Sequence, residues 1–170
     1  MSFLCVSNRV QPYDWAAFLR TRLDTHKNDT LLNGLTRAGW RLAWREKPTE
    51  YYKSVMDGYR RKADDFFYSL GFDVAKEGKL KNLRWGSPAF DAGLDDAAQL
   101  VAVNNRAYTP ERLGEAISSA KASKAPIQLL VKEGEAFRTV SIPYSGGLRY
   151  PTLERIEGTE DRLQLVLQPR

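Results

Sequence analysis

The fold is decided by the stretch Trp85-Gly86-Ser87-Pro88-Ala89-Phe90-Asp91-Ala92-Gly93-Leu94. Ser87 is a residue type that caps helix N-termini, and Pro88 suits the first turn of a helix, where a missing N–H has no cost. Gly93 then favours an early end to that helix. The stretch therefore predicts a turn and a short helix, inside a segment whose other patterns predict strands.

Further strand and helix patterns lie on both sides of this short helix. Asn104-Asn105 favours a tight turn, because Asn tolerates positive φ, and Gly134 divides a hairpin pattern. Thr109-Pro110 again places a capping residue before a first-turn proline. The predicted order is strand, glycine break and strand over 66–74, a strand over 80–85, the short helix, a strand over 100–103, a helix over 110–122 and a hairpin over 127–142.

The first part of the chain predicts a small helical segment. Asp14 is a candidate N-cap, and apolar residues follow it at helical spacing over 15–23. A second short helix is expected to end at Gly39, and residues 40–45 alternate apolar and polar side chains as a half-buried strand does. Residues 48–62 predict a helical or irregular connector. Because the first part is too small for a strong core of its own, we expect it to pack against another part of the protein.

Four pieces of the second part resemble, in order, the PDZ domains of bacterial proteases. They are Ser69-Leu70-Gly71-Phe72, similar to the apolar-Gly-apolar carboxylate-binding loop; residues 85–94, similar to the "GSPA…AGL" turn and short helix; Val101-Ala102-Val103-Asn104-Asn105-Arg106, similar to the "AVNG" strand and turn; and the helix over 110–122, in the place of the groove-lining helix. The resemblance covers a little under half of the chain. It implies an α+β chain containing a PDZ-like, partly open antiparallel β-barrel with two helices.

A second resemblance covers nearly the whole chain. The stretches Val10-Gln11-Pro12-Tyr13-Asp14-Trp15, Gly39-Trp40-Arg41-Leu42, Tyr68-Ser69-Leu70-Gly71-Phe72 and Gly146-Gly147-Leu148-Arg149-Tyr150-Pro151 are similar to the C-terminal portion of bacterial glycyl-aminopeptidase-like zinc metallopeptidases. Those proteins carry a thermolysin-like catalytic domain followed by a PDZ domain. The resemblance implies that residues 1–62 are the helical end of a truncated catalytic domain, 63–145 the PDZ-like domain, and 146–170 an extension packing on it.

The catalytic chemistry of that family has no counterpart in this sequence. Its zinc motif places two His around a Glu on a helix, whereas this chain has one histidine, His26. The single cysteine, Cys5, excludes an internal disulfide and a cysteine-based metal cluster. We therefore expect no catalytic residue, no metal ligand and no cofactor in this chain. The resemblance implies zinc for the parent enzyme only, on a helix that would precede Met1.

The PDZ resemblance implies that a peptide or protein C-terminus binds by adding a strand to the sheet edge at 72–75. The carboxylate of the peptide would be bound by the backbone N–H groups of Gly71 and Phe72, since a glycine permits positive φ and close approach of an anion. An apolar pocket would take the last side chain. The implied peptide-binding residues are Leu70, Gly71, Phe72, Asp73 and Val74 on the loop and strand, and Pro110, Gly114 and Ile117 on the helix.

A structural role is the alternative. The tail from Gly146 to Arg170, in which Leu163, Leu165 and Leu167 alternate, could fold back, pair with a sheet edge and take the place of the peptide. The domain would then hold the catalytic domain of the parent chain or a second subunit. The run Arg60-Arg61-Lys62 is interpreted as solvated charge rather than as part of a site.

Composition argues against two other classes of partner. The net charge of +5 arises from 26 basic residues interleaved with 21 acidic ones, so no basic stripe indicates nucleic-acid binding. No stretch approaches the roughly 20 apolar residues that span a bilayer, and residues 1–6 lack the charged leader of a signal peptide. We expect neither nucleic acid nor membrane as a partner. The sequence leaves periplasm and cytoplasm equally open for a bacterial protein.

Overall fold

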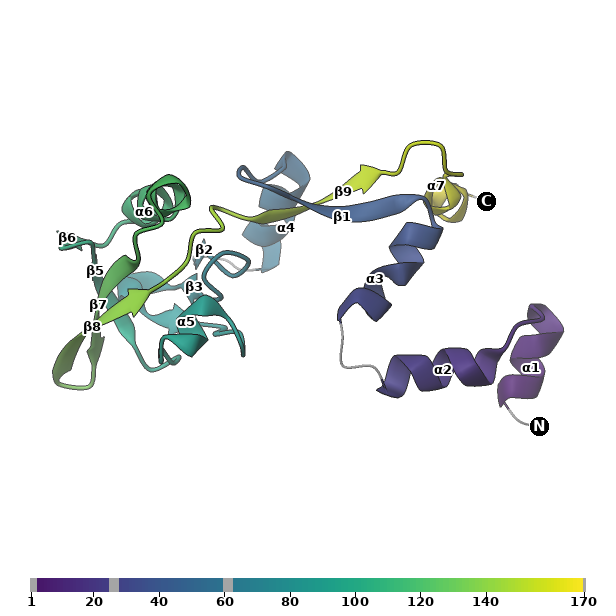
Figure 1. Ribbon diagram of the computed structural model, residues 1–170, viewed down its shortest axis with the longest axis horizontal. Helices are drawn as coiled ribbons and strands as arrows, with labels where there is room; N and C mark the ends of the chain where they lie inside the picture. Colours follow the sequence, from purple (N-terminus) through teal and green to yellow (C-terminus); the bar gives the residue numbers. More distant parts are fainter. Residues whose placement is uncertain (1–2, 25–27, 60–62, 170) are drawn as a thin grey trace. The chain divides into compact units, whose positions relative to one another are not determined.

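The structure is a computed structural model, and it describes residues 3–24, 28–59 and 63–169 (Figure 1). Helices and antiparallel strands are both present, which confirms the predicted α+β class. The chain divides into two compact units. We call Met1–Ala43 with Leu153–Arg170 the terminal unit, and Trp44–Thr152 the central unit. Residues 44–62 and 146–152 thus belong to the central unit, beyond the predicted bounds of 63–145.

The terminal unit is mainly helical. Its helices are α1 (Phe3–Val10), α2 (Trp15–Asp24), α3 (Asn28–Arg37) and α7 (Arg162–Leu167). The strands β1 (Trp40–Arg45) and β9 (Tyr150–Arg155) pair in a two-stranded sheet, and the boundary between the units falls inside both strands. The predicted cap of α2 is confirmed, because the Ala17 N–H donates to Asp14 Oδ1 at 2.9 Å.

The alternating leucines near the C-terminus lie on a helix, so their interpretation as a strand pattern is wrong. Asp161 caps α7, with its Oδ1 accepting from the N–H of Gln164 at 3.0 Å. The same oxygen accepts from Trp40 Nε1 at 2.9 Å. A capping carboxylate at this position favours helical geometry in the following turn, which the spacing of the leucines alone did not reveal.

The central unit contains two open antiparallel sheets that do not close into a barrel (Figure 1). The first sheet has the order β2-β3-β4 and the second β6-β5-β7-β8. The elements are α4 (Glu50–Tyr59), β2 (Asp64–Asp65), β3 (Asp73–Val74), the 3₁₀ turn η1 (Lys76–Gly78), β4 (Leu80–Lys81), α5 (Pro88–Asp91), β5 (Gln99–Val103), β6 (Arg106–Ala107), α6 (Pro110–Ser123), β7 (Ile127–Glu133) and β8 (Ala136–Ile142). Their order is the predicted PDZ-like order.

The turn and cap predictions of the central unit are confirmed. Ser87 Oγ accepts from the Phe90 N–H at 3.2 Å, and Thr109 Oγ accepts from the Arg112 N–H at 3.3 Å. Asn104 and Asn105 have φ values of 47° and 61° in the turn between β5 and β6. These local signals hold because each one satisfies backbone groups within a few residues.

The predicted strands around Gly71 and Leu80 are shorter than expected. Residues 66–71 form a turn, so the first strand lies earlier, at Asp64–Asp65. The strand from Leu80 ends at Lys81, because Asn82 takes a φ of 56° and its amide donates to the buried Asp73 at 2.7 Å. Apolar composition favoured strands here, but side-chain hydrogen bonds end them early.

One buried apolar cluster stabilises the central unit. Leu113, Ala116 and Ala120 of α6 face this core, as their helical spacing predicts. The largest of the fully buried side chains belong to Phe72, Leu70, Leu80, Leu113, Ile117, Ile127, Leu129 and Ile142. By contrast, neither α2 nor α7 of the terminal unit contributes a buried residue. None of the described helices has the length and apolar character that a bilayer crossing requires.

Candidate peptide groove

The predicted carboxylate loop is a tight turn whose amides are already used. The Phe66 carbonyl accepts hydrogen bonds from the N–H groups of Ser69, Leu70 and Gly71, at 3.1, 2.9 and 3.1 Å. Gly71 has a φ of +100°, so the prediction that this glycine adopts positive φ is confirmed. The residue is buried, however, and its N–H points at a carbonyl of its own turn. Binding a carboxylate there would first require this turn to open.

Close packing is a second reason for a glycine at this position. A Cβ on Gly71 would lie 2.1 Å from the Cβ of Ser87 and 2.2 Å from its Oγ. Ser87 is itself fully buried, since it caps α5. Sequence reasoning found this glycine through its conformation, but the contact with α5 became visible only in three dimensions.

Strand β3 is not an edge strand. On one side Asp73 and Val74 pair with Asp65 and Asp64 of β2, and on the other side they pair with β4. The expectation of an exposed edge at 72–75 is therefore wrong at Asp73 and Val74. The reason is that the chain turns back at residues 66–71 and supplies its own antiparallel neighbour to β3.

Two tyrosines hold β2 in that position. Tyr108, just before α6, donates its hydroxyl to Asp64 Oδ2 at 2.9 Å. Tyr52 of α4 donates its hydroxyl to Asp65 Oδ2. Burial, followed by the hydrogen bond to Asp64, holds the pKa of Tyr108 far above its usual value. Sequence reasoning missed both tyrosines, because no local signal connects residues 52 and 108 with β2.

The helix side of the groove is covered as well. Leu148 packs against the core, and its Cδ1 lies 3.9 Å from the Cβ position of Gly114. A Cβ on Gly147 would lie 3.0 Å from Cδ of Lys121, one further turn pair along the same face of α6. Residues 147–148 therefore lie along the face that was predicted to line a groove.

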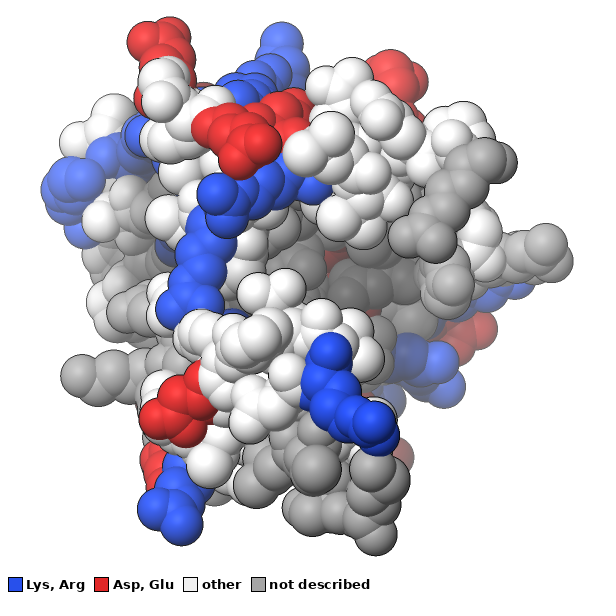
Figure 2. All heavy atoms as spheres, turned by 90° about the vertical axis from the view of Figure 1, so that its right-hand side faces the viewer, with Lys and Arg blue, Asp and Glu red and all other residues white. Residues whose placement is uncertain are grey.

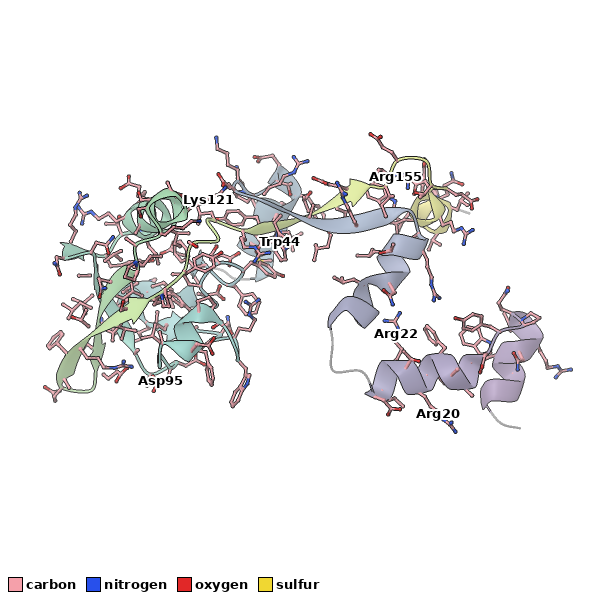
Figure 3. All side chains as sticks on the ribbon, viewed as in Figure 1. Arg20, Arg22, Trp44, Asp95, Lys121 and Arg155 are labelled. Carbon is pink, nitrogen blue, oxygen red and sulfur yellow. The ribbon has the colours of Figure 1, made fainter. Side chains whose placement is uncertain are left out.

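The segment that covers α6 is fastened at two points. The hydroxyl of Tyr144 donates to the Gly147 carbonyl at 2.8 Å, and the N–H of Arg149 donates to Ser69 Oγ at 3.1 Å. Lys121, labelled in Figure 3, forms an ion pair with Glu46 beside Gly147. The tail alternative named the segment from 146 onward, and residues 146–149 lie where that alternative requires.

The predicted site residues come together, but mostly inside the core. Leu70, Phe72, Val74 and Ile117 belong to one buried cluster, and Asp73 is fully buried beside Asn82. Pro110 and Gly114 are only partly exposed. Nothing tests whether these residues bind a peptide, so that role stays a prediction.

An open cleft lies at the end of β3, beyond the part that β2 covers. It has a volume of about 560 Å³. Ala75 and the η1 turn form one side, and Ala107 and Tyr108 contribute to the other. The full lining is Asp64, Val74, Ala75, Lys76, Glu77, Gly78, Gln99, Leu100, Val101, Ala107 and Tyr108. Sequence reasoning did not predict this cleft.

The described residues offer no metal centre. Within residues 3–24, 28–59 and 63–169 there is no group of three or more His, Cys, Asp or Glu side chains that could hold a metal ion. His26 and the run Arg60-Arg61-Lys62 lie outside the described residues. Charges of both signs lie interspersed on the face that Figure 2 shows.

Comparison with known proteins supports the fold. No family model matches the chain, and no curated protein matches it. The crystal structure of an aminopeptidase N family protein from Idiomarina loihiensis matches 95% of this chain with a TM-score of 0.58 and 15% identity. This chain spans 27% of that protein. The HtrA3 PDZ domain bound to a phage-derived ligand (FGRWV) matches 68% of this chain and 91% of its own, with a TM-score of 0.35 and 19% identity. The predicted likeness to a region of an aminopeptidase-like protein with a PDZ-like fold is confirmed at the level of fold.

Proposed function

We propose that this chain is a non-catalytic, PDZ-like interaction module of a zinc aminopeptidase, and that its own residues fill its peptide groove. The observation that carries the proposal is the position of β3 between β2 and β4, since strand addition needs a free edge. The parent activity rests on the fold of the aminopeptidase N family protein, of which this chain spans 27%.

Both walls of the groove support a filled state. On the strand side, β2 is fixed by hydrogen bonds from Tyr108 and Tyr52 to its two aspartates. On the helix side, Leu148 lies against Gly114. A peptide would have to displace both segments, and the lost contacts would be subtracted from its affinity. The module would instead hold the catalytic domain of its parent chain or a second subunit.

Peptide binding with and without a free C-terminus tests this proposal. A peptide library is titrated by fluorescence polarisation, once with free and once with amidated C-termini. We expect no difference between the two forms for the native chain, because the Gly71 amide donates to Phe66. Micromolar binding that amidation abolishes would contradict the filled groove.

A variant that frees β2 completes the test. Asp64→Ala combined with Asp65→Ala removes both tyrosine hydrogen bonds and leaves the core residues in place. If β2 covers a functional edge, this variant gains binding to free C-termini while remaining folded. Exposed Asp91→Ala combined with Asp96→Ala removes the same charge elsewhere and should gain nothing.

Peptide recognition by strand addition is the second candidate, and one observation favours it. The cleft of about 560 Å³ beside Ala75 leaves room for part of a peptide at the end of β3 without moving β2. Ala75→Trp would fill this cleft. Loss of peptide binding in that variant, with the amidation response absent, would assign binding to the cleft.

The proposed absence of catalysis is tested directly. The chain is incubated with zinc and a glycyl-anilide substrate, and release of the aniline is followed. We expect no turnover, because the zinc-binding helix would belong to the remainder of the parent protein. Activity that a chelator removes would contradict this assignment.

A further inference from the structure

A row of aromatic and arginine side chains lies on the central unit. The Arg149 guanidinium lies over the ring of Trp44 at 4.5 Å, and the Arg84 guanidinium lies over the ring of Phe67 at 5.5 Å. Between them, the ring centroids of Trp44 and Tyr68 are 5.3 Å apart, and those of Tyr68 and Phe67 are 5.2 Å apart. The five side chains form one row with a guanidinium at each end, which we call the arginine–aromatic row (Trp44 is labelled in Figure 3).

Both arginines are fixed through their main chain to the same turn. The Arg84 N–H donates to the Gly71 carbonyl at 2.8 Å, and the Arg149 N–H donates to Ser69 Oγ at 3.1 Å. The positions of the two guanidinium groups therefore depend on the fold rather than on flexible loops. A side-chain substitution at either position leaves these main-chain bonds in place.

Neither guanidinium of the row has an acidic partner in the described part of the chain. Other arginines do form ion pairs with carboxylates, namely Arg41, Arg138, Arg155 and Arg162. Arg84 is exposed, and Trp44 is 40% exposed, so a ligand can reach both ends of the row. Stacking on aromatic rings holds a guanidinium in a defined plane, ready to bind an oxyanion.

The two positive charges converge on one point. Burial raises the pKa of the Tyr144 hydroxyl, while the nearby charges of Arg149 and Arg84 both lower it. Both guanidinium groups therefore lie close to the same hydroxyl. An anion beside Tyr144 would feel both charges at once.

We propose that Arg84 and Arg149 form a carboxylate-binding site for an acidic polypeptide segment, with Trp44, Tyr68 and Phe67 supplying apolar contact surface. The planar fork of a guanidinium binds a carboxylate through two parallel hydrogen bonds. The carboxylate comes from Asp and Glu side chains or from a free C-terminus. A nucleic acid would need a longer series of cations, whereas basic and acidic side chains alternate over the face in Figure 2.

The site does not depend on the state of the groove, and an amidated probe keeps the two apart. Fluorescein-labelled hexaglutamate with an amidated C-terminus is titrated with the full chain in low-salt buffer and followed by fluorescence polarisation. We expect saturable binding that Arg84→Gln combined with Arg149→Gln weakens at least about tenfold, because both guanidinium forks are removed. An amidated hexaglutamine peptide should not bind.

A matched control removes the same charge elsewhere. Arg106→Gln combined with Lys79→Gln changes two exposed residues outside the row and should weaken hexaglutamate binding less than about twofold. If the glutamine pair does not fold, Arg84→Lys combined with Arg149→Lys replaces it. That pair keeps the charge but loses the planar forks, so we expect at least about threefold weaker binding.

A second probe separates the two sources of carboxylate. An uncharged peptide with a free C-terminus that competes with hexaglutamate assigns the site to chain ends, and failure to compete assigns it to acidic side chains. The proposal is overturned if no carboxylate peptide binds, if the control pair weakens binding as much as the glutamine pair, or if hexathymidylate competes better than hexaglutamate.

Discussion

At the scale of single residues, Gly71 combines a positive φ with lack of space. Its hypothetical Cβ meets Ser87 at 2.1 Å, whereas that of Gly93, with a φ of +80°, meets nothing within 4 Å. We expect Gly71→Ala to lower the free energy of unfolding by about 2 to 5 kcal/mol, because backbone strain and overpacking add. Gly93→Ala should cost only the strain, about 1 to 2 kcal/mol.

Urea unfolding of the two alanine variants measures the difference. Gly93 serves as the control, since both glycines lie in the left-handed region and only the packing differs. Equal losses in the two variants would mean that Ser87 moves aside freely. The contact between the turn at 66–71 and α5 would then contribute little to the fold.

A second residue-scale prediction concerns the carboxyl of Asp161. The hydrogen bond from Trp40 Nε1 is the largest cause that holds its pKa below the usual value of 3.8, and the N–H of Gln164 adds to it. Because the folded pKa is depressed, the stability that Asp161 contributes is fully present above pH 3.8 and is lost as pH falls through the folded value.

Carboxyl chemical shifts followed by NMR between pH 2 and 6 test this prediction, over a range of about four pH units around the usual Asp value. We expect Asp161 to titrate below 3.8 in the native chain and closer to that value in Trp40→Phe. Trp44→Phe removes an indole whose described contacts are to Tyr68 and Arg149, and should leave the titration unchanged. A midpoint that does not move in Trp40→Phe would contradict the assigned cause.

At the scale of elements, the attachment of β2 depends on Tyr108. We expect Tyr108→Phe to lower the free energy of unfolding by about 1 to 2 kcal/mol at neutral pH, because the Asp64 carboxylate loses a donor. Burial and Asp64 raise the pKa of Tyr108 above 10.0. Its contribution is therefore fully present below pH 10.0 and is lost as the pH rises above that value, where the unfolded chain ionises first.

Urea unfolding at pH 8 and 11, about one to two units on either side of the ordinary tyrosine pKa, measures this effect. The difference between the native chain and Tyr108→Phe should shrink at the higher pH. Tyr51→Phe is the control, since Tyr51 is 80% exposed and its loss should change neither value. A difference that stays constant to pH 11 would show that Tyr108 ionises as freely in the folded chain as in the unfolded one.

At the scale of the whole molecule, the two units should differ in stability. The buried apolar cluster extends over residues 66–142 of the central unit, while α2 in the terminal unit has no buried residue. Amide hydrogen exchange depends on such burial. We expect the amides of β5, β7 and α6 to exchange at least about a hundredfold more slowly than those of α2, a difference of about 3 kcal/mol in opening free energy.

Exchange measured by NMR or mass spectrometry on the full chain decides this. The hairpin of β7 and β8 and the helix α2 are both regular and hydrogen-bonded, so secondary structure alone would protect both. Equal protection of α2 and β7 would mean that the helices of the terminal unit are stabilised by contacts beyond the described residues.

The local signals of the sequence were sufficient for much of the PDZ-like module. Ser87 and Thr109 cap α5 and α6, Asn104 and Asn105 form the turn after β5, and Gly71 adopts positive φ. Each signal is satisfied within a few residues, so no knowledge of distant partners is needed. Apolar spacing in the same way predicted which face of α6 packs against the core.

The state of the groove was decided by tertiary structure alone. Which strand lies beside Asp73 and Val74 depends on the return of the chain at 66–71, and on hydroxyls from residues 52 and 108 that meet β2. Likewise, the two arginines of the arginine–aromatic row are 65 positions apart in the chain and meet only through one turn. Periodicity and capping are properties of neighbours in sequence, whereas edge occupancy and charge pairing are properties of neighbours in space.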